Sequence, residues 1–259
     1  MRRSVLSMSC VCTAVALVAS AAGCGSGSSP APGPARPPVA STTPSPSGPP
    51  YHPVINPASF SNRVSNPLFP LAPGTTNVFA GSKDGKPEQV ETTVTREAKT
   101  IMGVRCVVIS DVVTSNQTLV EKTLDWYAQD AQGNVWYFGE DSKDYTNGVV
   151  TSTHGTWEAG VDNAQPGIVM PASPRVGQSY RQESRPGVAE DQAKVLQIDV
   201  SGRVPYGAFR SGLTTLDTDP LDPAKIEHKT FAPGIGLVSA VRQGSAHVED
   251  IQLISVRRA

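Results

Sequence analysis

The sequence predicts an all-β protein whose folded part is an antiparallel domain of barrel-like or sandwich-like form. Short runs rich in Val, Ile, Thr and aromatic residues recur every ten to fifteen positions, and such residues favour strands. Turn-forming pairs such as Asp84-Gly85 and Asn147-Gly148 separate the runs, and these residues tolerate the positive φ angles of tight hairpins. No stretch sustains the apolar period of about 3.6 residues that marks a helix.

The predicted strands follow one another along the whole domain. In chain order they are 75–80, 89–97, 105–113, 119–129, 135–139, 148–157, 179–183, 194–200, 208–216, 226–231, 237–241 and 247–256. The stretch nearest to a helix is 188–196, where acidic residues come early and Lys194 comes late. Gly187 and the strand-like residues after Lys194 would keep such a helix short.

Two parts of the domain also resemble each other at a nearly constant spacing. Trp126-Tyr127-Ala128 recurs as Thr230-Phe231-Ala232, and this is one of four matches that occur in the same order at offsets of 103 or 104 positions. A fixed offset is the signature of an internal repeat. We therefore expect two similar β halves, at about 67–140 and 171–241, which are joined by residues 141–170 and share one core.

The first 23 residues have the layout of an export signal. Arg2 and Arg3 form a basic head, the residues from Val5 to Ala22 are apolar or small, and Gly23-Cys24 follows. The apolar run is too short and too rich in small residues to form a typical membrane-spanning helix, which needs about 20 strongly hydrophobic residues. The alternative is an ordinary secretory signal cut after Ala19-Ser20-Ala21.

The end of this signal resembles the lipobox of bacterial lipoproteins, with Ala22-Gly23 directly before Cys24. The resemblance implies cleavage before Cys24, a diacylglycerol thioether on its sulfur, and often a third acyl chain such as palmitate on the new amino terminus. The protein would then be lipid-anchored on the outer face of the bacterial cell membrane.

Residues 24–58 are predicted to form the lipidated cysteine and a disordered tether. From Gly25 to Pro50 every residue except Arg36 and Val39 is Gly, Ser, Thr, Ala or Pro. This composition has too little apolar surface to offset the entropy of ordering. Its prolines give a maximum reach of about 3.1 Å per residue, so the tether would hold the domain at 59–259 away from the membrane.

The charge and the cysteines limit the partners of that domain. It carries 19 basic and 23 acidic side chains, and this net charge of −4 offers no basic footprint for nucleic acid. Membrane attachment must therefore come from acyl chains.

Cys106 is the one cysteine of the domain, so no disulfide can form within the domain. The apolar residues around Cys106 predict that it is a buried structural thiol.

A second resemblance rests on turn and strand motifs. Phe231-Ala232-Pro233-Gly234-Ile235-Gly236-Leu237-Val238, together with Pro70 to Thr76 near the start of the domain, is similar to uncharacterised bacterial envelope lipoproteins built from antiparallel sheet. The resemblance implies a fold and a location, but no activity.

No catalytic, cofactor or metal motif is present in the sequence. The histidines His52, His154, His228 and His247 lack the spacing of metal ligands, and neither a nucleophile elbow in the folded part nor a phosphate-binding loop occurs. We therefore expect no catalytic residue, no cofactor and no metal site.

Candidate ligand-cleft residues gather around the connecting segment, and they are Trp126, Trp136, Trp157, Tyr180, Arg181 and Glu183. They would suit an apolar, amphiphilic or sugar ligand, but ordinary core packing and salt bridges explain them as well. The predicted function is a non-catalytic binding or scaffold module, whose partner is a hydrophobic small molecule or an envelope protein. The alternative is an envelope hydrolase with two carboxylates between residues 158 and 191, spaced about 5 to 10 Å apart.

Overall fold

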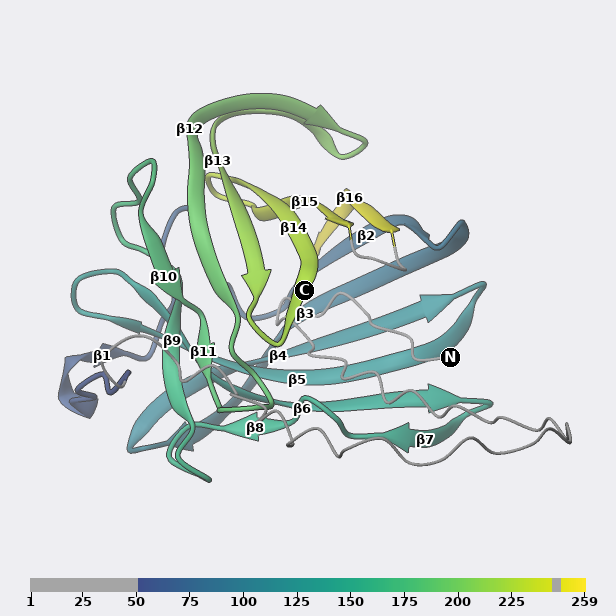
Figure 1. Ribbon diagram of the computed structural model, residues 1–259. Helices are drawn as coiled ribbons and strands as arrows, with labels where there is room; N and C mark the ends of the chain where they lie inside the picture. Colours follow the sequence, from purple (N-terminus) through teal and green to yellow (C-terminus); the bar gives the residue numbers. More distant parts are fainter. Residues whose placement is uncertain (1–50, 244–247) are drawn as a thin grey trace, which may run out of the picture.

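The chain forms one antiparallel sheet that curls into a nearly closed barrel (Figure 1). The computed structural model describes residues 51–243 and 248–259, and sixteen strands and one short 3-10 helix, η1 (Pro57–Ser59), lie within them. The predicted all-β, barrel-like class is confirmed. The signal, Cys24 and most of the tether lie outside the described residues. Within the same ranges, no helix has the length and apolarity to cross a membrane.

Ten long strands form two meanders. The first consists of β2 (Thr75–Lys83), β3 (Lys86–Ile101), β4 (Val104–Ser115), β5 (Thr118–Asp130) and β6 (Val135–Thr146), and the second of β12 (Gln192–Val204), β13 (Gly207–Asp219), β14 (Asp222–Ala232), β15 (Gly236–Gln243) and β16 (Val248–Arg258). The short strands are β1 (Phe60–Ser61), β7 (Val149–Ser152), β8 (Trp157–Glu158), β9 (Gln165–Met170), β10 (Ser179–Arg181) and β11 (Glu183–Ser184).

The order of the strands explains how the sheet closes. It runs β10-β12-β13-β14-β15-β16-β2-β3-β4-β5-β6-β9-β11. Its two ends, β10 and β11, are consecutive in the chain, with only Gln182 between them. The two predicted halves are thus neighbouring parts of one sheet, and their origin by duplication stays a prediction.

The possible helix at 188–196 is not formed. The segment ends in β12, where Ala193 and Val195 are at most 2 % exposed and alternate with the exposed Lys194. Pairing with β10 on one side and β13 on the other therefore outweighs a weak local helical pattern.

The hairpin turns follow the predicted chemistry. Asp84 and Gly85 have φ angles of 51° and 73°, and Asn147 and Gly148 have angles of 52° and 77°. Both residues of each pair thus adopt the left-handed conformation that suits two-residue hairpin loops. Met102, between β3 and β4, also adopts the left-handed conformation, with a φ angle of 49°. A methionine does not predict such a turn, because residues other than Gly, Asn and Asp rarely have positive φ angles.

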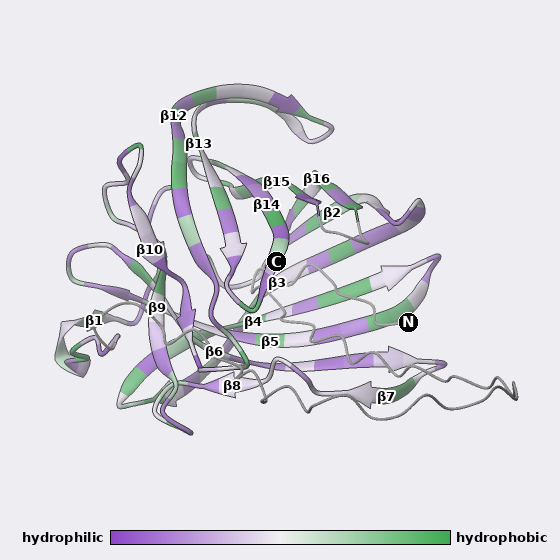
Figure 2. Ribbon diagram, viewed as in Figure 1, coloured by the Kyte–Doolittle hydropathy of each residue, from purple (hydrophilic) through white to green (hydrophobic). Residues whose placement is uncertain are grey.

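One part of the barrel interior is an aromatic core. The ring of Phe69, from the segment before β2, lies 5.3 Å from that of Tyr127 and 6.4 Å from that of Phe231. Tyr127 stacks on Tyr137 at 4.8 Å. The segment before β2 therefore packs between strands of both meanders. Figure 2 shows hydrophilic and hydrophobic bands alternating along the long strands, so much of the remaining sheet is polar.

We expect Gly81→Ala to destabilise the junction between the meanders. Gly81 in β2 pairs with Ile251 in β16, and a Cβ atom at Gly81 would lie 1.7 Å from the carbonyl oxygen of Asp250. Backbone must move to relieve this clash, so the free energy of unfolding should fall by about 2–3 kcal/mol in a urea titration. The neighbouring exposed residue gives the control, since Ser82→Ala should change it by less than about 0.5 kcal/mol. Equal effects of the two substitutions would contradict this packing.

Candidate functional site: a buried ionic network

The barrel encloses many charged side chains. Among the described residues, sixteen charged groups are at most 8 % exposed. Twelve are carboxyl groups, namely those of Glu88, Asp111, Glu121, Asp125, Asp130, Glu140, Glu183, Asp191, Asp217, Asp219, Glu227 and Glu249. The other four are the basic groups of Lys83, Lys225, Lys229 and Arg242, so the buried acids exceed the buried bases by eight. Buried charges are costly unless they are paired or protonated, so this interior demands a functional or structural explanation.

Strand register places these charges in a row. Glu227, Arg242, Glu249 and Lys83 stand directly opposite one another on β14, β15, β16 and β2. Side chains of directly opposite residues point to the same face of a sheet. The resulting ion pairs are Glu227–Arg242 at 3.4 Å, Arg242–Glu249 at 3.5 Å and Glu249–Lys83 at 3.8 Å.

Lys229 extends the row toward β13. Its ammonium group lies 3.0 Å from the Asp217 carboxylate and 3.3 Å from the Glu227 carboxylate. Burial alone would raise the pKa of Glu227, but Arg242 and Lys229 outweigh burial and lower this pKa to about 2. The same two carboxylates raise the pKa of Lys229 against the effect of burial. The centre of the row is therefore fully ionised at neutral pH.

The carboxyl groups at the end of the row behave differently. Burial raises the pKa of Glu88 to about 8, and the nearby Glu249 carboxylate adds to the effect. Burial also raises the pKa of Glu121 to about 8, with a further contribution from Asp144. At neutral pH both groups are therefore mostly protonated, which removes part of the excess negative charge.

A second cluster lies where the sheet closes. Lys225 of β14 lies 3.6 Å from Asp191 and 3.8 Å from Asp219. Trp157 of β8 donates its indole N–H to Glu183 at 3.0 Å, and Gln182 donates to Asp217 at 3.1 Å. Gln182 and Glu183, at the junction of β10 and β11, thus lie close to buried charged groups of β13 and β14.

The six predicted cleft residues lie at different places. Trp157 and Glu183 form the hydrogen bond just described. The ring of Trp126 lies 3.4 Å below the Lys99 ammonium group, and Trp136 donates to Asp130 at 2.8 Å. All three tryptophans and Tyr180 belong to the core or pack against it. Arg181 lies 5.5 Å from the ring of Tyr51. A ligand-binding role for this set stays a prediction.

The carboxylates proposed for hydrolysis have separate partners. Glu183 and Asp191 are at most 1 % exposed. On the surface, Glu158 binds Lys99 at 2.6 Å and Asp162 binds Arg185 at 3.0 Å. Glu190 accepts a hydrogen bond from the Gly187 N–H at 2.8 Å. Each of these carboxyl groups is thus either enclosed or bonded to a neighbouring group.

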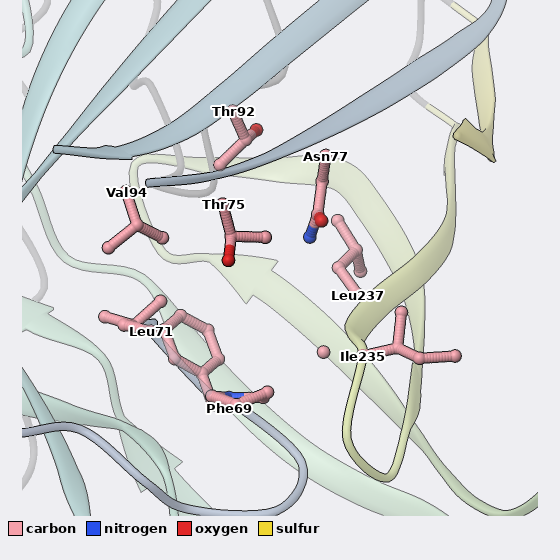
Figure 3. A pocket seen from close by; sticks show the side chains of 10 residues that line it. Phe69, Leu71, Thr75, Asn77, Thr92, Val94, Ile235 and Leu237 are labelled. Carbon is pink, nitrogen blue, oxygen red and sulfur yellow. The ribbon is translucent and has the colours of Figure 1, made fainter. Parts of the chain in front are cut away.

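An apolar pocket lies beside the aromatic core, between the start of β2 and the turn before β15 (Figure 3). Its lining includes Phe69, Leu71, Val94, Ile235 and Leu237. The free volume is about 20 Å³. This is room for about one water molecule and far too little for a lipid chain.

Two further observations concern metals and thiols. Among the described residues, no group of three or more His, Cys, Asp or Glu side chains is arranged to hold a metal ion. Cys106 is free and buried, as the sequence predicts, and burial raises its pKa to about 12. It is therefore a core residue without thiolate reactivity.

The fold and the network together define a barrel-shaped β body with an ionic interior. No protein-family model and no curated protein matches the sequence. A crystal structure from Bacteroides fragilis, described provisionally as an exported protein with a YmcC-like fold, matches with 12% identity, 74% coverage of this chain, 99% coverage of its own and a TM-score of 0.43. A provisionally described lipoprotein from Parabacteroides distasonis matches with 14% identity, 73% and 98% coverage and a TM-score of 0.40. These similarities are too low for a family or a function to follow.

Removal of a buried cation from the row should destabilise the fold. In Lys229→Met the stem remains, but Asp217 and Glu227 lose the ammonium group that compensates them. We expect the free energy of unfolding to fall by about 3–5 kcal/mol in a urea titration at pH 7. The matched control is Arg257→Met, which breaks the Arg257–Glu91 pair at 2.8 Å on the surface and should cost less than about 1 kcal/mol. Similar losses of stability in both variants would show that the buried ion pairs of Lys229 stabilise the fold no more than a surface ion pair does.

Glu121 should make stability depend on pH. Its folded-state pKa of about 8 is above the ordinary value of about 4.3, so folding favours its protonated form. Its contribution is complete below about pH 4 and is lost as pH rises to about 8. Unfolding titrations at pH 5, 7 and 9 should therefore show a smaller loss of stability in Glu121→Gln than in the unmodified protein. Parallel pH profiles would refute this assignment.

Proposed function

We propose that this protein is an exported lipoprotein, held on the outer face of the bacterial cell membrane by acyl chains on Cys24. Its β body would act there as a non-catalytic binding or scaffold module. The observation that carries the proposal is the sequence Ala22-Gly23-Cys24 at the end of a short apolar segment with a basic head. Two or three acyl chains hold a protein firmly, whereas one chain binds reversibly.

The position of Tyr51 supports the arrangement of tether and body. Tyr51 is the first described residue, and its hydroxyl donates to the carbonyl oxygen of Pro166 in β9 at 3.1 Å. The tether would therefore join the body at the side of the barrel where the sheet closes. With acyl chains in the membrane, the body would be presented at the end of a Pro-rich spacer.

The separate partners of the carboxylates between residues 158 and 191 favour a non-catalytic role over hydrolysis. The small apolar pocket favours a scaffold over a carrier of lipids in this closed form. A lipid-sized ligand would not fit this pocket. An envelope protein that binds the outside of the body would need no pocket.

The anchor is tested with Cys24→Ala in the native host. We expect the unmodified protein in the membrane fraction, with an intact mass that includes acyl chains and lacks residues 1–23. The variant should leave that fraction or retain its signal, because the thioether cannot form. If the variant stays in the membrane at the mass of the unmodified protein, the anchor hypothesis is wrong.

A further inference from the structure

The barrel is closed by one thin segment, residues 179–184, which we call the strap. It consists of β10 with three residues, Gln182, and β11 with two residues, whereas β3 alone has 16. β10 pairs with β12 and β11 pairs with β9. The pairing of β11 with β9, over two residues, is the shortest along the strand order that closes the barrel, so the sheet is most easily opened there.

A glycine in β9 lets the strap lie close to its neighbour. A Cβ atom at Gly167 would lie 2.3 Å from the carbonyl carbon of Gln182 and 2.5 Å from the carbonyl oxygen of Arg181. Gly167 does not have a positive φ angle, so an alanine there would be strained only by this contact. Gly167 thus provides a purely steric way to push the strap away.

Behind the strap lie polar atoms that the closed barrel does not satisfy. Within the described part of the chain, the Tyr180 hydroxyl, Oε1 of Gln182 and Oε1 of Glu183 are buried without a hydrogen-bond partner. Both carboxylate oxygens of Asp191 are also without one, although Lys225 lies 3.6 Å away. Opening would hydrate all of these atoms, which lowers its cost.

In front of the strap, Tyr51 connects its two sides. The hydroxyl of Tyr51 binds the carbonyl of Pro166 in β9, and the Arg181 guanidinium of β10 lies 5.5 Å from the centre of its ring. A cation above an aromatic ring is attracted by it. Tyr51, a residue of the segment 24–58 predicted as the tether, therefore holds β9 and β10 together.

We propose that the strap is the gate of the barrel, that it opens by separating from β9 and β12 to expose the ionic interior, and that Tyr51 is its latch. The strap and Tyr51 consist of described residues, and opening of the strap does not depend on acyl chains at Cys24. It gives the interior a route to solvent, which the closed barrel lacks along this side.

The charges behind the strap couple the gate to pH. The groups that face Glu183 and Asp191 are Asp217 and Asp219 of β13, Lys225 and Lys229 of β14, Arg242 of β15, Tyr137 of β6 and Trp157 of β8. Burial raises the pKa of Glu183 to about 8 and that of Asp191 to about 7, against the opposing effect of Lys225. The closed form therefore binds protons more tightly than an open, hydrated form.

The direction of the pH effect follows from this difference. Closure is favoured below about pH 4, where both forms are protonated. Opening becomes easier as pH rises to about 8, by up to about tenfold per pH unit for each proton released. Above the pKa of both groups in the closed form, the effect levels off.

Hydrogen exchange of the full-length protein, followed by mass spectrometry between pH 5 and 9 and corrected for intrinsic rates, tests the gate. We expect amides of residues 179–184 and 192–194 to open more readily than those of residues 89–94 in β3. Gly167→Ala should raise the opening constant of the strap about tenfold or more. Tyr51→Ala should raise it about threefold to tenfold. The control is Tyr206→Ala, which should leave it unchanged, because Tyr206 is 42% exposed and its backbone N–H, which alanine keeps, donates to Leu253 of β16.

The combined substitution of Glu183→Gln and Asp191→Asn should remove the pH dependence of strap opening. The gate is refuted if the strap is as well protected as β3, or if Tyr51→Ala and Tyr206→Ala behave alike. If Gly167→Ala unfolds the whole domain, which the exchange of β3 would reveal, the comparison of the two tyrosine variants decides. A strap that opens equally at all pH values would refute the role of the two carboxyl groups.

Discussion

The row of opposite charges on β14, β15, β16 and β2 is the constraint on which the rest of the structure depends. Glu227, Arg242, Glu249 and Lys83 meet because their strands are paired in one register, and a shift of one residue would turn every member to the other face of the sheet. An apolar core tolerates small displacements, whereas a buried charge without its partner is very unfavourable. The row therefore selects one alignment of the strands that join the two meanders.

The interior thus combines two kinds of packing. Around Phe69 and Tyr127 the contacts are aromatic and need no special alignment beyond shape. Along the ionic row the contacts are directional and depend on protonation, since Glu227 stays charged while Glu121 stays mostly neutral. The barrel is accordingly held by apolar contacts in one region and by a balance of charge and bound protons in another.

The sequence predicts the ten long strands well because each carries its own local pattern of β-branched residues and turns. The prediction of one strand at 148–157 is wrong, since β7 and β8 are separate there, and β9 was not predicted. The sequence also predicts the buried thiol of Cys106, because the residues around it form a local apolar run. It does not predict the network, because the contact of Glu227 with Arg242 depends on a turn and on an irregularity beside Phe231. The alternation of Lys225, Glu227 and Lys229 at every second position, like that of Asp217 and Asp219, was a local signal of a charged inner face. The closeness of Gly167 to Gln182 has no local signal at all, and neither has the failure of the short helix before β12.

The pairing of β2 with β16 has a consequence for how the protein is made. These strands lie near opposite ends of the domain, so residues 75–83 must wait for residues 248–258 before they have both neighbours. Contacts between such distant residues form slowly, because a long loop must close first. A growing polypeptide therefore leaves one edge of β2 unpaired until its last strand arrives.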